Sequence, residues 1–254
     1  MRDASALAFG TLTAWPVPPP RRVDRRVAGA AMLLAPLTQL PFLALSTLGV
    51  WVWSALHGPP AVAAVLLVAA LALSSRALHL DGLADTADGL TASYDRERSL
   101  QIMRTGDVGP AGAATLVLVL LLQVTALAGL LTAGSGAALL AVVAVLASRQ
   151  ALALACVTGI PAADSGGLGA TVAGSVGRAG AAASAGGMLL VAALPALAGI
   201  PWWAGPLTVV GAWLGAGVVV QRARRRLGGI TGDILGAAVE VSLAAALTMA
   251  ALAS

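Results

Sequence analysis

Three long stretches of the chain carry no charged side chain, and they constrain the fold more than any other feature. They cover residues 27–75, 108–148 and 179–221, and they are 49, 41 and 43 residues long. A transmembrane helix needs about 20 mostly apolar residues, so each stretch is long enough for two spans and a turn. A last apolar segment, 234–253, is interrupted only by Glu240. The pattern predicts an all-α, polytopic integral membrane protein with about seven transmembrane helices, arranged as three hairpins and a final span.

The composition excludes a soluble enzyme. The chain is 59% hydrophobic and only 10% charged, whereas an average soluble domain is about 25% charged. The apolar runs are continuous and do not alternate with polar residues, which argues against a transmembrane β-barrel. We expect a single membrane domain over residues 1–254, in which residues 1–28 form a cytoplasmic or interfacial arm. This arm lacks the features of a cleavable signal peptide.

The charged residues fall on one side of the predicted membrane domain. All fifteen basic residues are arginines, and the turns inside the three hairpins contain none of them. The positive-inside rule places the side that carries the arginines in the cytoplasm. We therefore expect a multi-pass protein of the cytoplasmic membrane with its active site facing the cytoplasm. Membrane orientation and contact with lipid explain the basic excess, and we expect no nucleic-acid partner.

An acidic segment, residues 79–110, follows the first hairpin and is the first candidate for catalysis. Asp81, Asp85 and Asp88 are spaced i, i+4 and i+7, so a helix would place all three carboxylates on one face. Such like charges repel one another unless a cation compensates them, and Mg²⁺ prefers oxygen ligands of this kind. The pattern predicts a Mg²⁺ site at these three residues. The alternative is an ordinary acidic loop neutralised by nearby arginines.

Two further features of the acidic segment are candidates for catalysis and phosphate binding. His79 could cap the helix, pair with Asp81 or act as a base near neutral pH. Arg104 and Asp107 lie in a glycine-containing turn before the next span, and such a turn with an arginine can hold phosphate. The alternative is that this turn only begins the third span.

The second motif region covers residues 222–240. A cluster of four arginines that ends at Arg226 precedes a Gly-Gly-Ile-Thr-Gly-Asp run containing Thr231 and Asp233. Glu240 lies seven residues after Asp233, on the same face of the predicted last helix. An acidic residue inside a span is costly and is a functional candidate by default. Arg149 is likewise a charged residue inside a predicted span, the fourth. Its side chain would extend either to the cytoplasmic face or to a substrate phosphate.

These motifs resemble those of the adenosylcobinamide-GDP ribazoletransferase, or cobalamin synthase, family. The resemblance rests on the run from His79 to Gly89, HLDGLADTADG, and on the run from Arg226 to Ala237, RLGGITGDILGA. It continues in order along the chain through four shorter segments: Pro16–Pro18, Met103–Gly109, Ser148–Arg149 and Gly167–Gly169. The chain departs from the family pattern at Thr105, at Ala14-Trp15 and over residues 163–166.

The resemblance implies a Mg²⁺-dependent transferase of the cytoplasmic membrane. The family joins adenosylcobinamide-GDP to α-ribazole or its 5′-phosphate, with release of GMP. On this interpretation Asp81, Asp85 and Asp88 hold Mg²⁺. The phosphate-binding candidates are Arg104, Asp107, Arg149, Arg226 and Thr231. The catalytic base is Asp233, Glu240 or His79, and the sequence does not choose among them.

Three alternatives are open from the sequence alone. A CDP-alcohol phosphotransferase also carries spaced aspartates, but with a different spacing from that after Asp81. An intramembrane prenyltransferase carries aspartate-rich motifs on two helices, whereas the second region here has only Asp233 and Glu240. A transporter would place its polar groups at the midplane of the membrane. The stripes of small residues in the predicted spans permit packing into a homo-oligomer.

Overall fold

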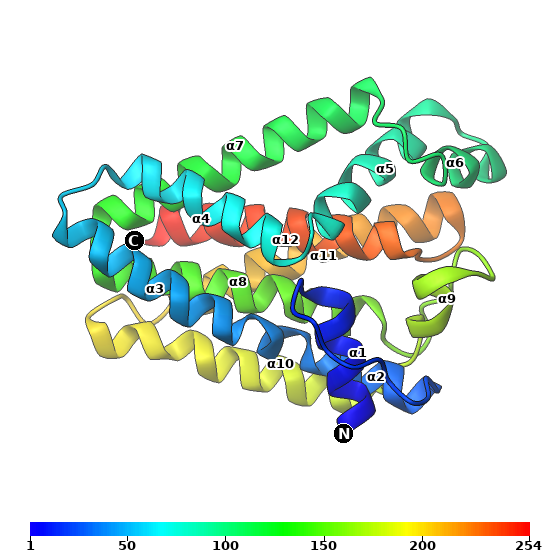
Figure 1. Cartoon of the computed structure of the whole chain (residues 1–254), viewed down its shortest axis with the longest axis horizontal. Coiled ribbons are helices and arrows are strands. Elements are labelled where there is room, and N and C mark those ends of the chain that lie inside the picture. Colours follow the sequence, from blue (N-terminus) through cyan, green and yellow to red (C-terminus); the bar gives the residue numbers. More distant parts are fainter.

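The computed structural model describes residues 1–254, and the chain folds into helices joined by short turns (Figure 1). In chain order they are α1 (Arg2–Leu12), α2 (Arg25–Leu34), a 3₁₀ segment (Ala35–Gln39), α3 (Leu40–Ala55), α4 (Pro60–Ser74), α5 (Leu78–Ala92), α6 (Arg96–Met103), α7 (Pro110–Ala133), α8 (Ser135–Ala155), α9 (Gly167–Val172), α10 (Arg178–Ala193), a second 3₁₀ segment (Leu194–Ala198), α11 (Ala204–Leu227) and α12 (Gly232–Ala253). No β-strand is present, so the all-α prediction is confirmed.

The helices match the predicted number of membrane spans. Six are long and apolar enough to cross a membrane: the continuous unit of α2, its 3₁₀ segment and α3, then α7, α8, α10 with its 3₁₀ segment, α11 and α12. A further candidate is α4 together with α5, which is bent by 88° relative to α4, so the pair is either one broken span or a re-entrant segment. The predicted hairpin turns lie between α3 and α4, between α7 and α8, and between α10 and α11.

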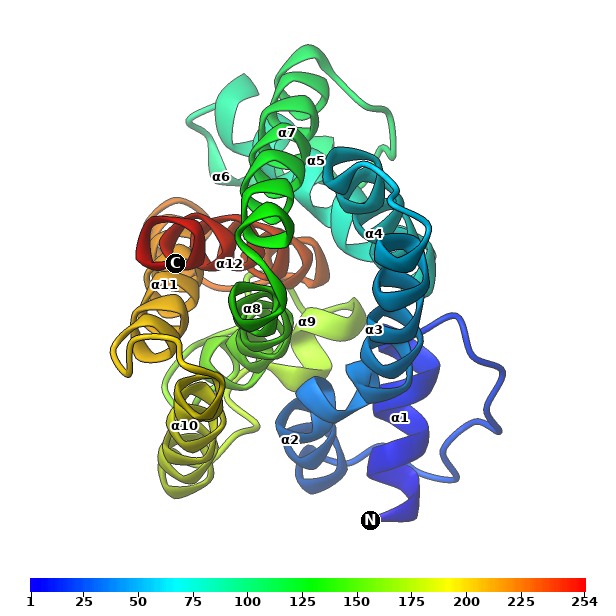
Figure 2. The same cartoon turned by 90° about the vertical axis from the view of Figure 1, so that its left-hand side faces the viewer.

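Helices α8 and α12 form the centre of the bundle, and the other spans surround them (Figure 2). In each of these two helices, 72% of the most apolar stretch is buried inside the protein, against 22% in α7 and α10. The apolar outer faces of the peripheral helices are those of a protein surrounded by lipid. Polar side chains on α8 and α12 are therefore enclosed by protein.

The two ends of the bundle differ in character (Figure 1). One end carries the three hairpin turns and the C-terminus, and the other carries α5, α6, α9 and the N-terminal arm. We call the second end the motif end, because residues 79–110 and 222–233 lie there. The acidic segment is not a loop but the helical pair α5 and α6 followed by a short turn.

A strained junction joins α4 to α5. Arg76 and Ala77 both have left-handed backbone conformations, with φ of 57° and 58°, and such a conformation costs an L-residue about 1–2 kcal/mol. The N-terminal arm supports this bend. The backbone N–H of Ala14 donates to the carbonyl of Ser74 at 2.6 Å, and the Arg76 guanidinium donates to the carbonyl of Gly10 at 3.1 Å. The bend carries α5 across α12 at the motif end.

Candidate active site

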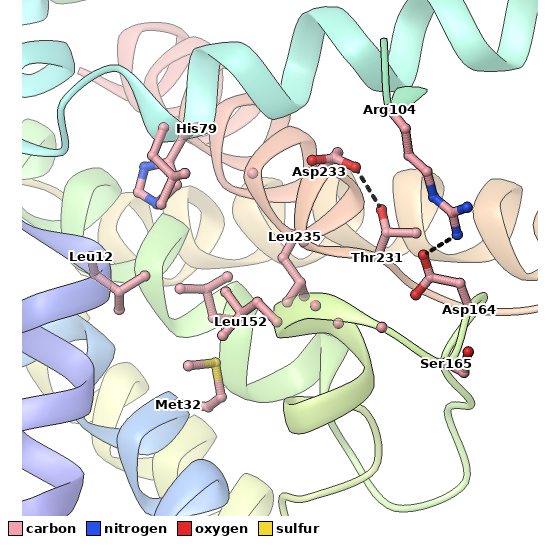
Figure 3. Close-up of a pocket in the computed structure, with 17 residues that line it drawn as sticks. Leu12, Met32, His79, Arg104, Leu152, Asp164, Ser165, Thr231, Asp233 and Leu235 are labelled. Carbon is pink, nitrogen blue, oxygen red and sulfur yellow. Dashed lines mark hydrogen bonds and ion pairs between the residues drawn. The ribbon is translucent and has the colours of Figure 1, made fainter. Parts of the chain in front are cut away.

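A cavity of about 630 Å³ opens at the motif end, where α5, α9 and α12 meet the N-terminal arm (Figure 3). We call two parts of its lining the floor and the rim. The floor is apolar and is formed by Leu12, Met32, Leu152 and Leu235, and the rim is polar and is formed by Arg104, Asp164, Thr231 and Asp233. A volume of this size accommodates a small organic ligand.

The cavity exists because α5 and α12 cross in direct contact. A Cβ atom on Gly82 would lie 2.7 Å from the carbonyl oxygen of Asp233, so only glycine permits this approach. A glycine inside a helix usually weakens it, but α5 is continuous from Leu78 to Ala92. The crossing instead brings Asp233 beside the acidic face of α5, although about 150 residues separate them in the chain.

The Asp85 carboxylate lies in an acidic environment that this crossing creates. Burial and the negative charges of neighbouring aspartates raise the pKa of Asp85 to about 6. In decreasing order of effect, these neighbours are Asp81, Asp233 and Asp88. The concentration of negative charge favours a bound cation, and its donors are the oxygen ligands that suit Mg²⁺.

Asp88 is used differently from the other two aspartates of α5. Its Oδ2 accepts the N–H of Gly109 at 2.7 Å, and its Oδ1 accepts the N–H of Gly112 at 2.9 Å. The carboxylate therefore caps the N-terminus of α7, where a negative charge is stabilising. No group of three His, Cys, Asp or Glu side chains converges to hold a metal ion. Mg²⁺ commonly uses only one or two carboxylates and takes its other ligands from water and substrate phosphates.

Thr231 and Asp233 shape the cavity rim at the start of α12. Thr231 is the N-cap of this helix, since its hydroxyl accepts the N–H of Ile234 at 3.3 Å. The same hydroxyl lies 3.2 Å from Asp233 Oδ2, to which it donates. Thr231 thus orients the Asp233 carboxylate at the edge of the cavity (Figure 3).

Arg104 is another residue of the rim and forms an ion pair with Asp164, whose Oδ2 is 2.9 Å from Nη2 (Figure 3). The Arg104 side chain is 65% exposed, so its remaining donors are available to a ligand. Asp164 was not among the sequence candidates, although it lies in the stretch that departs from the family pattern. Asp107 is exposed and is not part of the cavity lining.

A buried polar cluster lies inside the bundle beneath the cavity. Its Glu240 carboxylate accepts a hydrogen bond from Gln123 Nε2 at 2.8 Å and faces His79 Nδ1 at 3.9 Å. Arg149 donates to the Ser148 hydroxyl at 2.9 Å, and its Nε and Nη2 atoms have no partner. Glu240 and Arg149 are 5% and 1% exposed, and their opposite charges attract each other inside the bundle, although the two side chains form no direct ion pair.

The buried cluster changes two expectations. Arg149 neither extends to the surface of the motif end nor lines the cavity, so we now place it in the core of the bundle. Glu240 also lies off the cavity wall, whereas His79 is part of the lining. Sequence reasoning missed Gln123, and its only signal was an amide side chain within the uncharged run 108–148.

Arg226 is engaged with backbone at the end of α5 rather than aimed into the cavity. Its guanidinium donates to the carbonyls of Leu90 and Ser93, and it lies 4.5 Å from the centre of the Tyr94 ring. These contacts satisfy carbonyls that a helix C-terminus leaves free. The structure therefore places Arg226 as a residue that positions α5, and not on the wall where a phosphate would bind.

Comparison with known proteins identifies the family. The family described as cobalamin-5-phosphate synthase matches residues 4–251, which is nearly the whole chain. The chain belongs to this family. A relative from Nocardioides sp., named adenosylcobinamide-GDP ribazoletransferase, is 49% identical over 247 residues, covering 97% of each chain.

Further members of the cobalamin-5-phosphate synthase family carry the same name. The relative from Frankia casuarinae is 42% identical over 262 residues, covering 96% of this chain and 93% of its own. The relative from Rhizobium meliloti is 38% identical over 232 residues, covering 90% and 86%. No solved structure matches the chain. The match to the family includes the acidic helix α5, the cavity rim and the start of α12.

Proposed function

We propose that this chain is an adenosylcobinamide-GDP ribazoletransferase of the cytoplasmic membrane. The observation that carries the proposal is the cavity at the motif end, whose rim carries Asp233 of α12 and Arg104. The Asp85 carboxylate of α5 does not line this cavity, but it lies close enough to Asp233 for the two charges to interact. Relatives that share the whole length of the chain carry this name. The family match and the convergence of both motifs on one cavity support the same reaction.

The reaction is a phosphoryl transfer. A ribose hydroxyl of α-ribazole, or of its 5′-phosphate, attacks the phosphorus next to cobinamide in adenosylcobinamide-GDP. A new phosphodiester bond forms, the bond from that phosphorus to the oxygen of GMP breaks, and the hydroxyl proton passes to a base. Such a reaction needs neutralisation of the charge on the transferred phosphoryl and on the leaving phosphate.

Asp81 and Asp85 are the residues that we assign to Mg²⁺. Bound there, the ion would supply charge neutralisation for the pyrophosphate. Asp85 is buried among acidic neighbours, whereas Asp81 is exposed at the surface of α5. Two carboxylates and the substrate phosphates form the usual ligand set of Mg²⁺. Asp88 supports this pair by fixing α5 to the start of α7.

Asp233 is the residue that we assign as proton acceptor. It lines the cavity and its carboxylate is oriented by the Thr231 hydroxyl, while Glu240 is off the cavity wall. Arg104 is positioned across the rim to bind a substrate phosphate, because its fork-shaped guanidinium suits phosphate oxygens. Its ion pair with Asp164 holds this side chain at the rim before the substrate binds.

The distribution of arginines between the two ends of the bundle supports one membrane orientation. Arginines gather at the motif end, and the positive-inside rule then places the cavity on the cytoplasmic side. With seven crossings the C-terminus, which lies at the opposite end (Figure 1), would be on the other side of the membrane. Both substrates are polar, which agrees with an active site open to the cytoplasm.

The test uses the full-length protein in lipid vesicles. Adenosylcobinamide-GDP and α-ribazole 5′-phosphate are added with Mg²⁺, and release of GMP and formation of the corrinoid product are measured. We expect both with the wild type and neither when EDTA replaces Mg²⁺. Asp85→Asn should lower the rate at least 100-fold, while Asp107→Asn, at an exposed site off the cavity, should not. Release of CMP or pyrophosphate from other substrates, without a corrinoid product, would overturn the proposal.

A further inference from the structure

His79 is the most buried of the ionisable side chains that line the cavity. It is 3% exposed, it lines the cavity, and neither of its ring nitrogens has a hydrogen-bond partner. Glu240 is a charged neighbour, and its Oε1 is 3.9 Å from Nδ1 and so beyond hydrogen-bond distance. A buried imidazole without partners costs free energy, which a ligand atom can recover.

The surroundings of His79 define the chemistry of that ligand. The floor residues Leu12, Met32, Leu152 and Leu235 are all apolar, and the acidic lining residues Asp164 and Asp233 lie on the rim (Figure 3). An apolar pocket with a single hydrogen-bonding group suits a flat, mostly apolar ring that carries one polar atom.

We infer that the floor binds the aromatic base of the nucleoside substrate, with His79 donating a hydrogen bond to a ring nitrogen of that base. This inference rests on the proposed function, because it takes α-ribazole as the nucleoside. The base of α-ribazole is a benzimidazole, which has one free ring nitrogen and no N–H group. His79 is then a specificity-determining residue and not the proton acceptor.

The same floor discriminates against guanine. The Watson–Crick edge of guanine presents an N–H and an amino group, and both need acceptors when they are buried. The floor offers them no carboxylate, so a guanine base placed there would leave donors unpaired at a cost of about 1–3 kcal/mol each. The guanosine part of the second substrate therefore binds outside the floor.

This placement also orients the ribose. A base on the floor directs the sugar towards the rim, where Asp233 and Thr231 lie on α12 and Arg104 lies opposite. The ribose hydroxyls then face the carboxylate that we assign as proton acceptor. Binding of the base and transfer of the proton are thus performed by different side chains, His79 below and Asp233 above.

The test measures binding directly, by calorimetry on the full-length protein in detergent, so that it does not depend on turnover. The probes are α-ribazole, guanosine and ribose 5-phosphate. In the wild type we expect α-ribazole to bind at least tenfold more tightly than guanosine. His79→Leu should raise the Kd of α-ribazole at least tenfold, and His79→Gln, whose amide can still donate, should recover part of this loss. The Kd of ribose 5-phosphate should change less than twofold.

A second variant tests the floor without altering His79. Leu12→Trp, on the outer helix α1, adds volume to the floor, and we expect it to abolish binding of α-ribazole. The matched control is Leu214→Trp on α11, a leucine that is 59% exposed on the outer surface of the bundle. Thermal unfolding of each variant establishes that it is folded.

The outcomes separate this inference from the proposed function. Unchanged affinity for α-ribazole in both His79→Leu and Leu12→Trp overturns the assignment of the floor, and so does a wild type that prefers guanosine. GMP release is measured on the same preparations. If the wild type forms product but binds α-ribazole and guanosine equally well, only the floor assignment is overturned. Absence of product in the wild type overturns the proposed function, while the binding data still decide the occupant of the floor.

Discussion

The backbone of Asp233 lies so close to Gly82 that a Cβ atom on this glycine would be 2.7 Å from the Asp233 carbonyl oxygen and 2.9 Å from its Cα. The contact joins two helices that come from opposite halves of the chain. It determines how far the Asp233 carboxylate lies from Asp81 and Asp85. The geometry of the proposed site therefore depends on a residue that has no side chain.

Gly82→Ala tests this dependence. The added methyl group must push α5 away from the backbone of α12, so we expect a loss of about 1–3 kcal/mol in stability and a fall in GMP release of at least 100-fold. The control is Gly129→Ala on α7, where a Cβ would meet nothing within 4 Å. Thermal unfolding and the rate of GMP release are measured for both variants. A Gly82→Ala protein with wild-type activity would show that the crossing does not position the site.

Asp88→Asn should reduce stability more than it changes the chemistry. An asparagine has one acceptor oxygen, and its amide group would face one of the two N–H groups that Asp88 now binds. We expect a loss of about 1–2 kcal/mol, typical of a lost N-cap, visible as a lower unfolding temperature. Asp107→Asn, at an exposed position of the neighbouring turn, is the control. If Asp88→Asn leaves the unfolding temperature unchanged but raises the Mg²⁺ concentration needed for activity, then Asp88 is a metal ligand.

Asp85→Asn should change the pH dependence of stability in Mg²⁺-free buffer. The folded-state pKa of Asp85 is about 6, against 3.8 for the ordinary group. Because the folded pKa is raised, the unfolded chain loses this proton first as the pH rises, and stability falls between about pH 4 and pH 6. Asp85→Asn should remove this part of the decline, so that the variant is relatively more stable above pH 6. Identical pH profiles in unfolding experiments would contradict the acidic environment of Asp85.

Much of the fold could be predicted from the sequence, because the length of an uncharged run is a one-dimensional property that the membrane thickness converts directly into spans. The three hairpins and the location of the motifs at one end follow from it. The crossing of α5 and α12 could not be predicted, since it depends on which glycine meets which backbone. Gly82 was visible in the sequence. A glycine that only weakens a helix and a glycine that permits close packing cannot be told apart from the sequence, however.

The site residues were predicted less completely for a related reason. A carboxylate that caps a helix and one that binds a metal can share the same spacing, so Asp88 and Asp85 were indistinguishable in the sequence. Arg226 could likewise not be recognised as a partner of the α5 carbonyls. Gln123 and Asp164 acquire their roles from Glu240 and Arg104, which are remote in sequence but adjacent in the fold.

Arg104→Ala should weaken substrate binding with little effect on stability. The side chain is 65% exposed, and an exposed ion pair contributes at most about 1 kcal/mol. We expect the KM for adenosylcobinamide-GDP to rise at least tenfold. Asp164→Asn should also raise this KM, because the ion pair that holds Arg104 at the rim is lost. Arg98→Ala, on the exposed surface of α6, is the control in the same steady-state assay. An unchanged KM in Arg104→Ala would exclude a phosphate contact.

The buried pair Glu240 and Arg149 should be structural, and a double-mutant cycle can separate this role from a chemical one. Glu240→Leu alone leaves the Arg149 charge uncompensated inside the bundle, which costs about 3–5 kcal/mol. Arg149→Met alone has the converse effect. In the double variant neither charge remains, so it should be more stable than either single variant. A residual loss of about 1–3 kcal/mol is expected because Gln123 loses its acceptor.

The activity of the double variant decides between the two roles. Neither side chain lines the cavity, so a folded double variant should release GMP at a rate within tenfold of the wild type. Unfolding free energies of the four proteins give the coupling between the residues, and the rates are measured on the same samples. A double variant that is as stable as the wild type but inactive would instead place Glu240 or Arg149 in the reaction. In that case the proton acceptor would have to be sought below the cavity rather than at Asp233.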